Sequence, residues 1–227
     1  MVDVKFPNAC SEFIYVRTYS RWIDDKKRRE TWPETVERYI GFITKHQPDI
    51  PKKTIRKIKK YVTSFEVMPS MRMLWAAGPP AEKDNTCIYN CSFANIDSIE
   101  SFAECLHILM CGTGFGFSVS EKHVNKLPVV PELTTERLPD YVVPDSKEGW
   151  ADSVKVLMNA LYQGKHIHFD YSELRPEGAR LATMGGRSSG PAPLIRLHQF
   201  IREVFSKAQG RKLRPIDCHD VCNQIAE

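Results

Sequence analysis

The chain has 227 residues, of which 42% are apolar and 26% charged, as in ordinary globular proteins with room for one large domain or two small ones. It has no apolar run near the roughly 20 residues of a membrane span and no signal-peptide pattern, so we expect a cytoplasmic protein with no membrane partner. The formal net charge of +4 fits an anionic small ligand as well as nucleic acid and excludes neither.

The first third of the chain is predicted to be helical. Thr31 and Glu34 form a capping box, and apolar residues at helical spacing follow it. A second amphipathic helix carries a basic face over 52–60, which is most often a solvated surface; we therefore expect no nucleic-acid partner, although a nucleic-acid-binding protein using this face stays a third hypothesis. We assign residues 1–66 to an N-terminal helical region.

The middle of the chain combines turns, one helix and one strand. Residues 67–93 are rich in turn formers with short apolar runs. Asp97 is expected to cap a helix that Gly112 ends, and residues 115–119 have the pattern of a strand.

The C-terminal third continues this alternation. Residues 121–144 are expected to form a loop, Ser146 to cap a helix through Tyr162, and 167–170 to form a short strand. Three further segments are a long Gly/Ser/Pro loop at 175–193, a helix from Leu194 to Phe205, and a helix from Pro215 onward. Helices alternating with strands indicate the α/β class, with too few strands here to close a sheet.

Cys91 is the strongest candidate for chemistry. It lies between the Pro69–Ser70 turn and the glycine-rich run Gly112–Gly116, a setting that suits a reactive thiol beside a ligand pocket. From the residue alone a buried core cysteine is the commoner outcome, but Asn90 beside it adds polar groups that core sites rarely hold. The count of seven cysteines is odd, and without a secretory signal we expect reduced thiols.

The glycine run does not fit the known phosphate loops. Walker and dinucleotide-binding loops follow a strand and open a helix, whereas Gly112–Gly116 follows a helix and opens a strand. A turn that lets the backbone approach a sugar remains possible.

Two other segments carry weaker signals. The loop containing Arg175, Arg180 and Arg187 suits bidentate phosphate binding or a solvated surface loop about equally. Cys218 and Cys222 lie on an apolar helical face, so core packing is favoured over a zinc site and no metal is expected.

Taken in order, nine motifs resemble one family over essentially the whole chain. They are Tyr19-Ser20-Arg21-Trp22, Glu30-Thr31-Trp32-x-Glu34-Thr35-Val36-x-Arg38, Met68-Pro69-Ser70-x-Arg72-x-Leu74-Trp75, Asn90-Cys91-x-Phe93, Gly114-x-Gly116-Phe117-Ser118-Val119, Asp145-Ser146-x-Glu148-Gly149-Trp150, Arg175-Pro176-x-Gly178-Ala179, Gly185-Gly186-x-x-Ser189-Gly190-Pro191-x-Pro193-Leu194 and Asp220-x-Cys222-Asn223-x-Ile225. The order resembles the N-terminal part of class II, adenosylcobalamin-dependent ribonucleotide reductases, especially the ribonucleoside-triphosphate branch.

The resemblance implies a fold and an activity. The fold is the N-terminal helical region plus, at 67–227, the first half of a ten-stranded α/β barrel. The activity is reduction of ribonucleotides to 2′-deoxyribonucleotides by thiyl-radical chemistry, with a redox cysteine pair. The implied partners are adenosylcobalamin, a ribonucleotide substrate, a nucleotide effector and a thioredoxin-like reductant.

The resemblance also implies site residues. Cys91 matches the first cysteine of the reducing pair. Ser70, Asn90 and the turn Gly112, Thr113 and Gly114 match the substrate site. Arg175 and Arg180 lie in a segment that resembles the one near the specificity effector.

The chain departs from the family in what it lacks. The radical cysteine, the second reducing cysteine and the C-terminal relay cysteines have no counterpart, and residues 121–141 are shorter than in the monomeric triphosphate reductases. We therefore expect a split or intein-interrupted reductase that needs a C-terminal segment or chain, which would also hold most of the cofactor. The alternative is a non-catalytic nucleotide-binding or regulatory module of the same fold.

Overall fold

The computed structural model describes residues 5–181, 183 and 185–227, and these fall into two compact units. The first unit runs to Tyr89 and includes Thr183 and Gly185. The second unit begins at Asn90 and contains the remaining described residues. Cys91 and the glycine turn therefore belong to the second unit.

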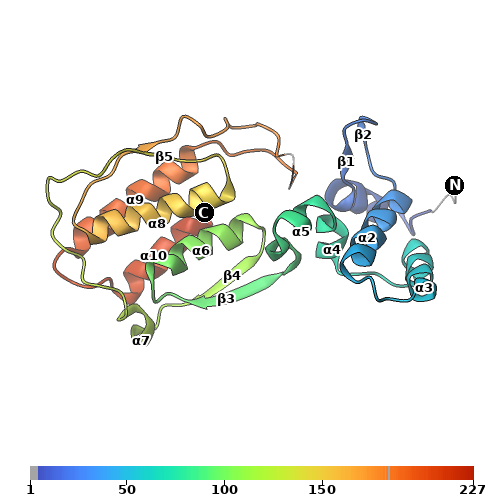
Figure 1. Ribbon diagram of the computed structural model, residues 1–227, viewed down its shortest axis with the longest axis horizontal. Helices are drawn as coiled ribbons and strands as arrows, with labels where there is room; N and C mark the ends of the chain where they lie inside the picture. The colour runs from blue at the N-terminus through green and yellow to red at the C-terminus, as the bar shows by residue number, and fades with distance from the viewer. Residues whose placement is uncertain (1–4, 182, 184) are drawn as a thin grey trace. The chain divides into compact units, whose positions relative to one another are not determined.

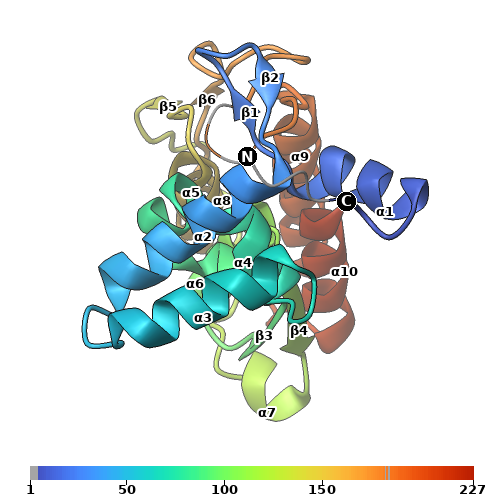
Figure 2. The same ribbon diagram turned by 90° about the vertical axis from the view of Figure 1, so that its right-hand side faces the viewer.

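The first unit is mainly helical. Its elements are α1 (Ala9–Ile14), the π-helical turn η1 (Tyr15–Tyr19), β1 (Trp22–Ile23), β2 (Arg28–Arg29), α2 (Trp32–His46), α3 (Lys52–Thr63), α4 (Met71–Ala76), α5 (Pro79–Lys83) and the 3-10 turn η2 (Asn85–Ile88). β1 and β2 form a short antiparallel ladder, and Figure 2 shows α2 and α3 side by side. The expectation of turns over residues 67–93 is wrong for α4 and α5, because helices this short show less than two turns of apolar periodicity.

Aromatic rings form the centre of this unit. Trp32 is buried at the start of α2 and stacks on Phe65 with ring centroids 4.8 Å apart, while Phe6 stacks on Tyr15 at 5.0 Å. The predicted capping box is confirmed, since the Thr31 backbone N–H donates to the Glu34 carboxylate at 2.8 Å. The cap thus fixes where α2 begins and places Trp32 over the core.

A nearly buried ion pair ties α2 to α4. Arg38 donates from Nε and Nη2 to the carboxylate of Glu30 at 2.8 and 2.9 Å, and its other hydrogen bonds go to the carbonyls of Ala77 and Leu74. Burial alone would raise the pKa of Glu30, but the hydrogen bonds and charge of Arg38 outweigh burial and hold that pKa below its usual value. The carboxylate therefore stays ionised inside the unit.

The second unit alternates helices with strands. Its elements are β3 (Cys91–Asn95), α6 (Ile99–Met110), β4 (Gly114–Ser118), α7 (Glu121–Val124), β5 (Tyr141–Val142), α8 (Lys147–Tyr162), β6 (Phe169–Asp170), α9 (Ala192–Ala208) and α10 (Pro215–Ala226). Figure 1 shows α6, α8, α9 and α10 gathered together, with β3 and β4 along one side of them. The predicted α/β class is confirmed, and none of the described helices is long and apolar enough to cross a membrane.

Two parallel βαβ units form the framework. β3 pairs with β4 across α6, and β5 pairs with β6 across α8. The predicted cap of α8 is confirmed, because Ser146 Oγ accepts from the Gly149 N–H at 2.9 Å. The expected Asp97 cap is wrong by one residue, since Ser98 caps α6 by accepting from the Ser101 N–H at 3.3 Å.

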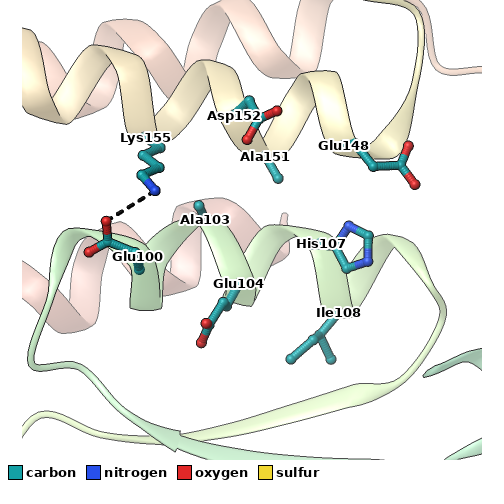
Figure 3. A pocket seen from close by; sticks show the side chains of 9 residues that line it. All are labelled: Glu100, Ala103, Glu104, His107, Ile108, Glu148, Ala151, Asp152 and Lys155. Carbon is teal, nitrogen blue, oxygen red and sulfur yellow. Dashed lines mark ion pairs between the residues drawn. The ribbon is translucent and has the colours of Figure 1, made fainter. Parts of the chain in front are cut away.

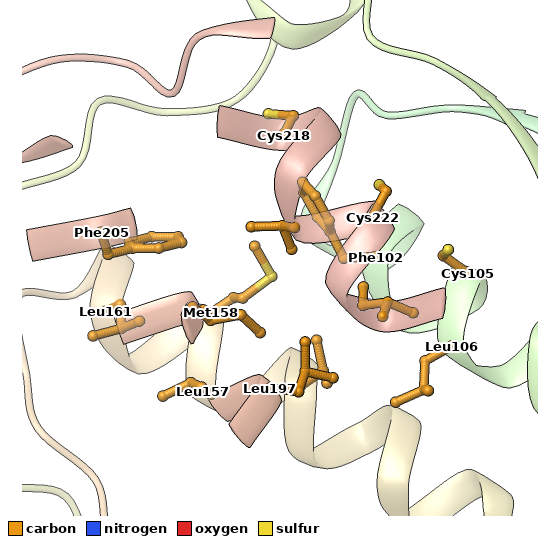
Figure 4. Packing of buried hydrophobic residues seen from close by; sticks show 14 of the residues in the cluster. Phe102, Cys105, Leu106, Leu157, Met158, Leu161, Leu197, Phe205, Cys218 and Cys222 are labelled. Atoms are coloured by element: carbon orange, nitrogen blue, oxygen red, sulfur yellow. The ribbon is translucent and has the colours of Figure 1, made fainter. Parts of the chain in front are cut away.

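The core of this unit lies among the four long helices. Figure 4 shows Phe102, Met158 and Phe205 packed there from α6, α8 and α9. Cys218 and Cys222 of α10 are fully buried in the same cluster, as the apolar spacing predicted.

The Glu30–Arg38 pair gives a first prediction. Arg38→Met removes the partner of a buried carboxylate, so we expect a loss of about 3–5 kcal/mol in the free energy of unfolding. Urea denaturation measures this loss. The matched control is Lys45→Met, which breaks the exposed Lys45–Glu82 pair and should cost less than about 1 kcal/mol. Equal losses would contradict the prediction.

Gly149 gives a second prediction. A Cβ at this position would collide with the carbonyl oxygen and Cβ of Pro144, so Gly149→Ala should displace the start of α8. We expect an overpacking loss of about 1–3 kcal/mol. Gly41, inside α2, has nothing within 4 Å of such a Cβ, and Gly41→Ala should stabilise by up to about 1 kcal/mol. Thermal unfolding of both variants checks the opposite signs.

Candidate functional site

Cys91 is the first residue of β3, not part of a loop as expected. Its Cα partner across the parallel ladder is Gly114, and the Gly114 N–H donates to the carbonyl of Asn90 at 2.9 Å. The cysteine is exposed. The structure therefore brings together Cys91, Asn90 and the end of the glycine turn.

The two faces of the β3–β4 pair differ in character. Side chains alternate along a strand, and paired positions share a face. Phe115 and Phe117 of β4 pack against the helical core. Cys91 and Phe93 therefore lie on the opposite face, where Phe93 is 69% exposed. The thiol is presented on the side of the sheet that the helices leave uncovered.

Glycines make the surface beside the thiol shallow. Gly114 lies opposite Cys91 and Gly116 opposite Phe93. A Cβ on Gly114 would come within 3.3 Å of the Asn90 carbonyl oxygen, so the strand pairing itself favours glycine there. Gly112 has a different reason to be glycine, because its φ of +80° ends α6 in the left-handed region.

The other predicted substrate residues occupy varied settings. Thr113 is only 1% exposed, which favours a packing role for its side chain. Ser70 belongs to the first unit, where it is exposed and precedes α4 as its N-cap residue. Ser92, which was not predicted, donates from Oγ to the Gly114 carbonyl at 3.0 Å and reinforces the strand pairing.

A second thiol lies at the start of the glycine turn. Cys111 is fully buried, and its Sγ accepts a hydrogen bond from Lys147 Nζ at 3.0 Å and lies 3.6 Å from His107 Nε2. This contact joins the end of α6 to the start of α8, and so supports the turn that carries Gly114.

The cysteines of the core are of another kind. Cys222 and Cys105 share a hydrogen bond, and that bond together with burial raises the pKa of Cys222 far above its usual range. Burial raises the pKa of Cys218 to about 12. Cys218 and Cys222 therefore stay protonated near neutral pH and lack the thiolate needed for exchange chemistry.

The predicted effector arginines lie in a loop with its own internal contacts. Arg175 donates from Nε to both carboxylate oxygens of Asp145 at 2.9 and 2.8 Å, which anchors the start of the loop. Arg180 is exposed and forms a backbone bridge with Arg187. The structure therefore gives Arg175 a structural partner and presents Arg180 on the surface.

A cavity of about 310 Å³ lies between α6 and α8 and was not predicted (Figure 3). Its charged lining residues are Glu100, Glu104, His107, Glu148, Asp152 and Lys155. Three of them lie on α6 and three on α8, each set at i, i+4 and i+7 spacing. This helical spacing is the sequence signal that could have predicted a shared face. Lys155 pairs with Glu100 at 3.1 Å, and neither Cys91 nor the glycine turn lines this cavity.

Two family models match the chain. The model described as ribonucleotide reductase alpha domain matches residues 2–79. The model described as B12-dependent ribonucleotide reductase, insertion domain, matches residues 123–205. The second match includes residues 123–141. These make up most of the segment that we expected to be shorter than in the monomeric triphosphate reductases.

Curated relatives match over nearly the whole chain. The adenosylcobalamin-dependent ribonucleoside-triphosphate reductase of Euglena gracilis is 30% identical over 240 residues, covering 96% of this chain and 32% of the relative. The enzyme of that name from Lactobacillus gasseri is 29% identical over 286 residues, covering 94% of this chain and 38% of the relative. That alignment is longer than the chain itself, so the relative carries residues that this chain lacks. The chain spans about a third of the length of these relatives.

The fold agrees with the sequences. A crystal structure of a B12-dependent, class II ribonucleotide reductase matches with a TM-score of 0.77 and 25% identity, covering 94% of this chain and 39% of that one. The arrangement is consistent with the expected partial barrel. Family models, relatives and structure thus agree that this chain is related to the N-terminal part of class II, adenosylcobalamin-dependent ribonucleotide reductases.

Proposed function

We propose that this chain is the N-terminal portion of a ribonucleotide reductase in which Cys91 is one of two reducing thiols. The observation that carries the proposal is the exposed Cys91 thiol opposite Gly114, on the sheet face that the helices leave open. A ribose can approach a thiol over glycine more closely than over any other residue, because glycine has no side chain. The relatives' shared name supplies the reaction class.

The proposed role of Cys91 follows from the electron balance. Replacing the 2′-hydroxyl of a ribonucleotide by hydrogen consumes two electrons and releases water. Cys91 and a second cysteine outside this chain would supply both electrons and become a disulfide. A thioredoxin-like dithiol would then reduce that disulfide by exchange, for which an accessible sulfur is needed.

The cavity between α6 and α8 is too small to enclose adenosylcobalamin. The cavity between α6 and α8 has about 310 Å³, at the lower end of ligand pockets, and a corrin ring with its nucleotide tail is much larger. The Cys91 face is an open strand surface. We therefore propose that residues outside this chain hold most of the cofactor, whose bound form supplies the radical chemistry.

The remaining active-site residues are also proposed to come from outside this chain. They can belong to the same polypeptide after splicing, or to a separate subunit. Intact-mass measurement of the protein from its native cells distinguishes these cases. One full-length species places these residues on the same polypeptide, and two persistent species that copurify support a heteromer.

The 175–190 loop is proposed to contact a nucleotide effector. Arg180 is exposed, and Arg175 pairs with the Asp145 carboxylate at 2.8 Å; both stay candidates for a phosphate contact. Ser70, Asn90 and the Gly112–Gly114 turn remain the proposed substrate contacts.

Cys91→Ser tests the reductase proposal in the complete protein. We expect deoxyribonucleotide formation to fall to background, because serine cannot enter a disulfide. Cys10 is also exposed, so Cys10→Ser is the matched control and should keep full activity. Product is measured by chromatography of labelled nucleotides. If Cys91→Ser retains activity, or if the wild type binds nucleotides but never reduces them, the regulatory-module alternative is favoured.

Gly114→Ala tests the shallow surface beside the thiol. The added methyl would press on the Asn90 carbonyl and stand next to Cys91, so we expect KM for the ribonucleotide to rise about tenfold, equivalent to about 1.4 kcal/mol. Gly116→Ala, whose Cβ would make ordinary contacts at 3.5 Å, is the control and should change KM much less. Equal KM values for the two variants would argue against substrate approach at Gly114.

A further inference from the structure

His198 is a buried titratable side chain of the second unit that the proposed chemistry does not use. It lies on α9 and is 2% exposed. Its ring contacts the ring of Phe169 with centroids 4.4 Å apart. Both ring nitrogens have partners from other elements, so the position of its proton can be worked out.

The hydrogen bonds run in one direction. Ser153 Oγ has a single proton and donates it to the Trp150 carbonyl at 2.7 Å. His198 Nε2, 3.0 Å from that Oγ, must therefore be the donor. In a neutral ring Nδ1 then carries no proton, and it accepts from the Tyr171 hydroxyl at 2.7 Å.

Burial and one neighbouring positive charge favour the neutral form of the His198 ring. The groups facing the ring are Ser153 from α8, Tyr171 and Phe169 from the β6 segment, and Arg202 one turn further along α9. Burial, with a smaller contribution from the Arg202 charge, lowers the pKa of His198 to about 3. Arg202 itself donates to the Ile167 carbonyl at 2.7 Å.

The Tyr171 bond closes a loop. Tyr171 directly follows β6, and the chain returns to α9 only after the long segment that ends at Gly190. The hydrogen bond joins residues 27 positions apart at the base of that segment. The backbone of Gly190, at the end of this segment, also lies close to that of Glu177 near its start. A Cβ on Gly190 would come within 3.0 Å of the Glu177 nitrogen.

We propose that His198 is a positioning residue: its neutral, Nε2-protonated ring accepts a hydrogen bond from the Tyr171 hydroxyl and thereby fixes Tyr171, at the base of the segment between β6 and α9, against α8 and α9. The inference goes beyond the proposed reductase function and does not depend on it. It concerns how the loop is held, whatever ligand the loop contacts.

Histidine-labelled NMR of the full 227-residue chain tests the protonation state. We expect His198 to show the Nε2–H tautomer and to keep it between pH 7.5 and 5. Through-bond correlation assigns the signals, so this test needs no variant. A ring protonated on Nδ1, or one that gains a second proton between pH 7.5 and 5, overturns the proposal.

Two substitutions separate positioning from core packing. Asn at 198 can place its oxygen where Nδ1 lies and keep the Tyr171 bond, whereas Gln can place its nitrogen where Nε2 lies and keep only the Ser153 bond. We expect amide exchange at Leu174 and Gly178 to become roughly 3- to 10-fold faster in His198→Gln and in Tyr171→Phe, and to stay within about twofold of wild type in His198→Asn. Equal acceleration in His198→Gln and His198→Asn overturns the proposal, because ring packing alone would then explain it.

The same ring gives a pH dependence of stability with a defined sign. The unfolded chain binds a proton at His198 below about pH 6.5, and the folded chain does not until about pH 3. Folding therefore weakens as pH falls through this window, by up to about tenfold in the folding constant per pH unit. His198→Asn lacks this titration and should show a flatter profile in urea denaturation at pH 5–7; an unchanged slope contradicts the assignment.

Discussion

The parallel pairing of β3 with β4 is the constraint on which the Cys91 site depends. The Gly114 N–H donates to the Asn90 carbonyl, and the Ser92 hydroxyl donates to the Gly114 carbonyl. These two hydrogen bonds fix the register of the two strands at Gly114. That register sets glycine opposite Cys91. A parallel pair needs a long crossover, and α6 supplies it while burying Phe102 in the core. The position of the thiol is therefore a consequence of helix packing at some distance from it.

Buried polar groups also fix neighbouring segments within each unit. In the first unit the Glu30–Arg38 pair reaches the backbone carbonyls of Leu74 and Ala77, and so adds polar contacts to residues that are already buried. In the second unit His198 adds such a contact to Tyr171. Each tie is fully hydrogen-bonded, and removing one partner leaves the other buried and unsatisfied. The ties thus add directional contacts to segments that also pack against the hydrophobic clusters.

The sequence predicted the long helices well because caps and apolar periodicity are local. Thr31 and Ser146 cap α2 and α8 as expected. The choice between Asp97 and Ser98 was missed, since both are good N-caps and only the path of the preceding strand decides between them. β5 and β6 have two residues each, too few to show alternation. The partnership of Cys91 with Gly114 is a tertiary fact, and motif order indicated that both residues matter without showing which face they share.

The character of the Cys91 face bears on how the site works. Phe93 is 69% exposed beside the thiol, and the helices cover only the other side of the strands. Reducing chemistry on a sugar needs water to be excluded from the reacting groups. An open strand surface does not exclude water, so the proposed role of Cys91 as a donor requires further protein over this face. The large exposed ring is suited to that contact, because burying an aromatic side chain contributes about 1.5–3 kcal/mol to association. The contact that completes the site would then also exclude water from it.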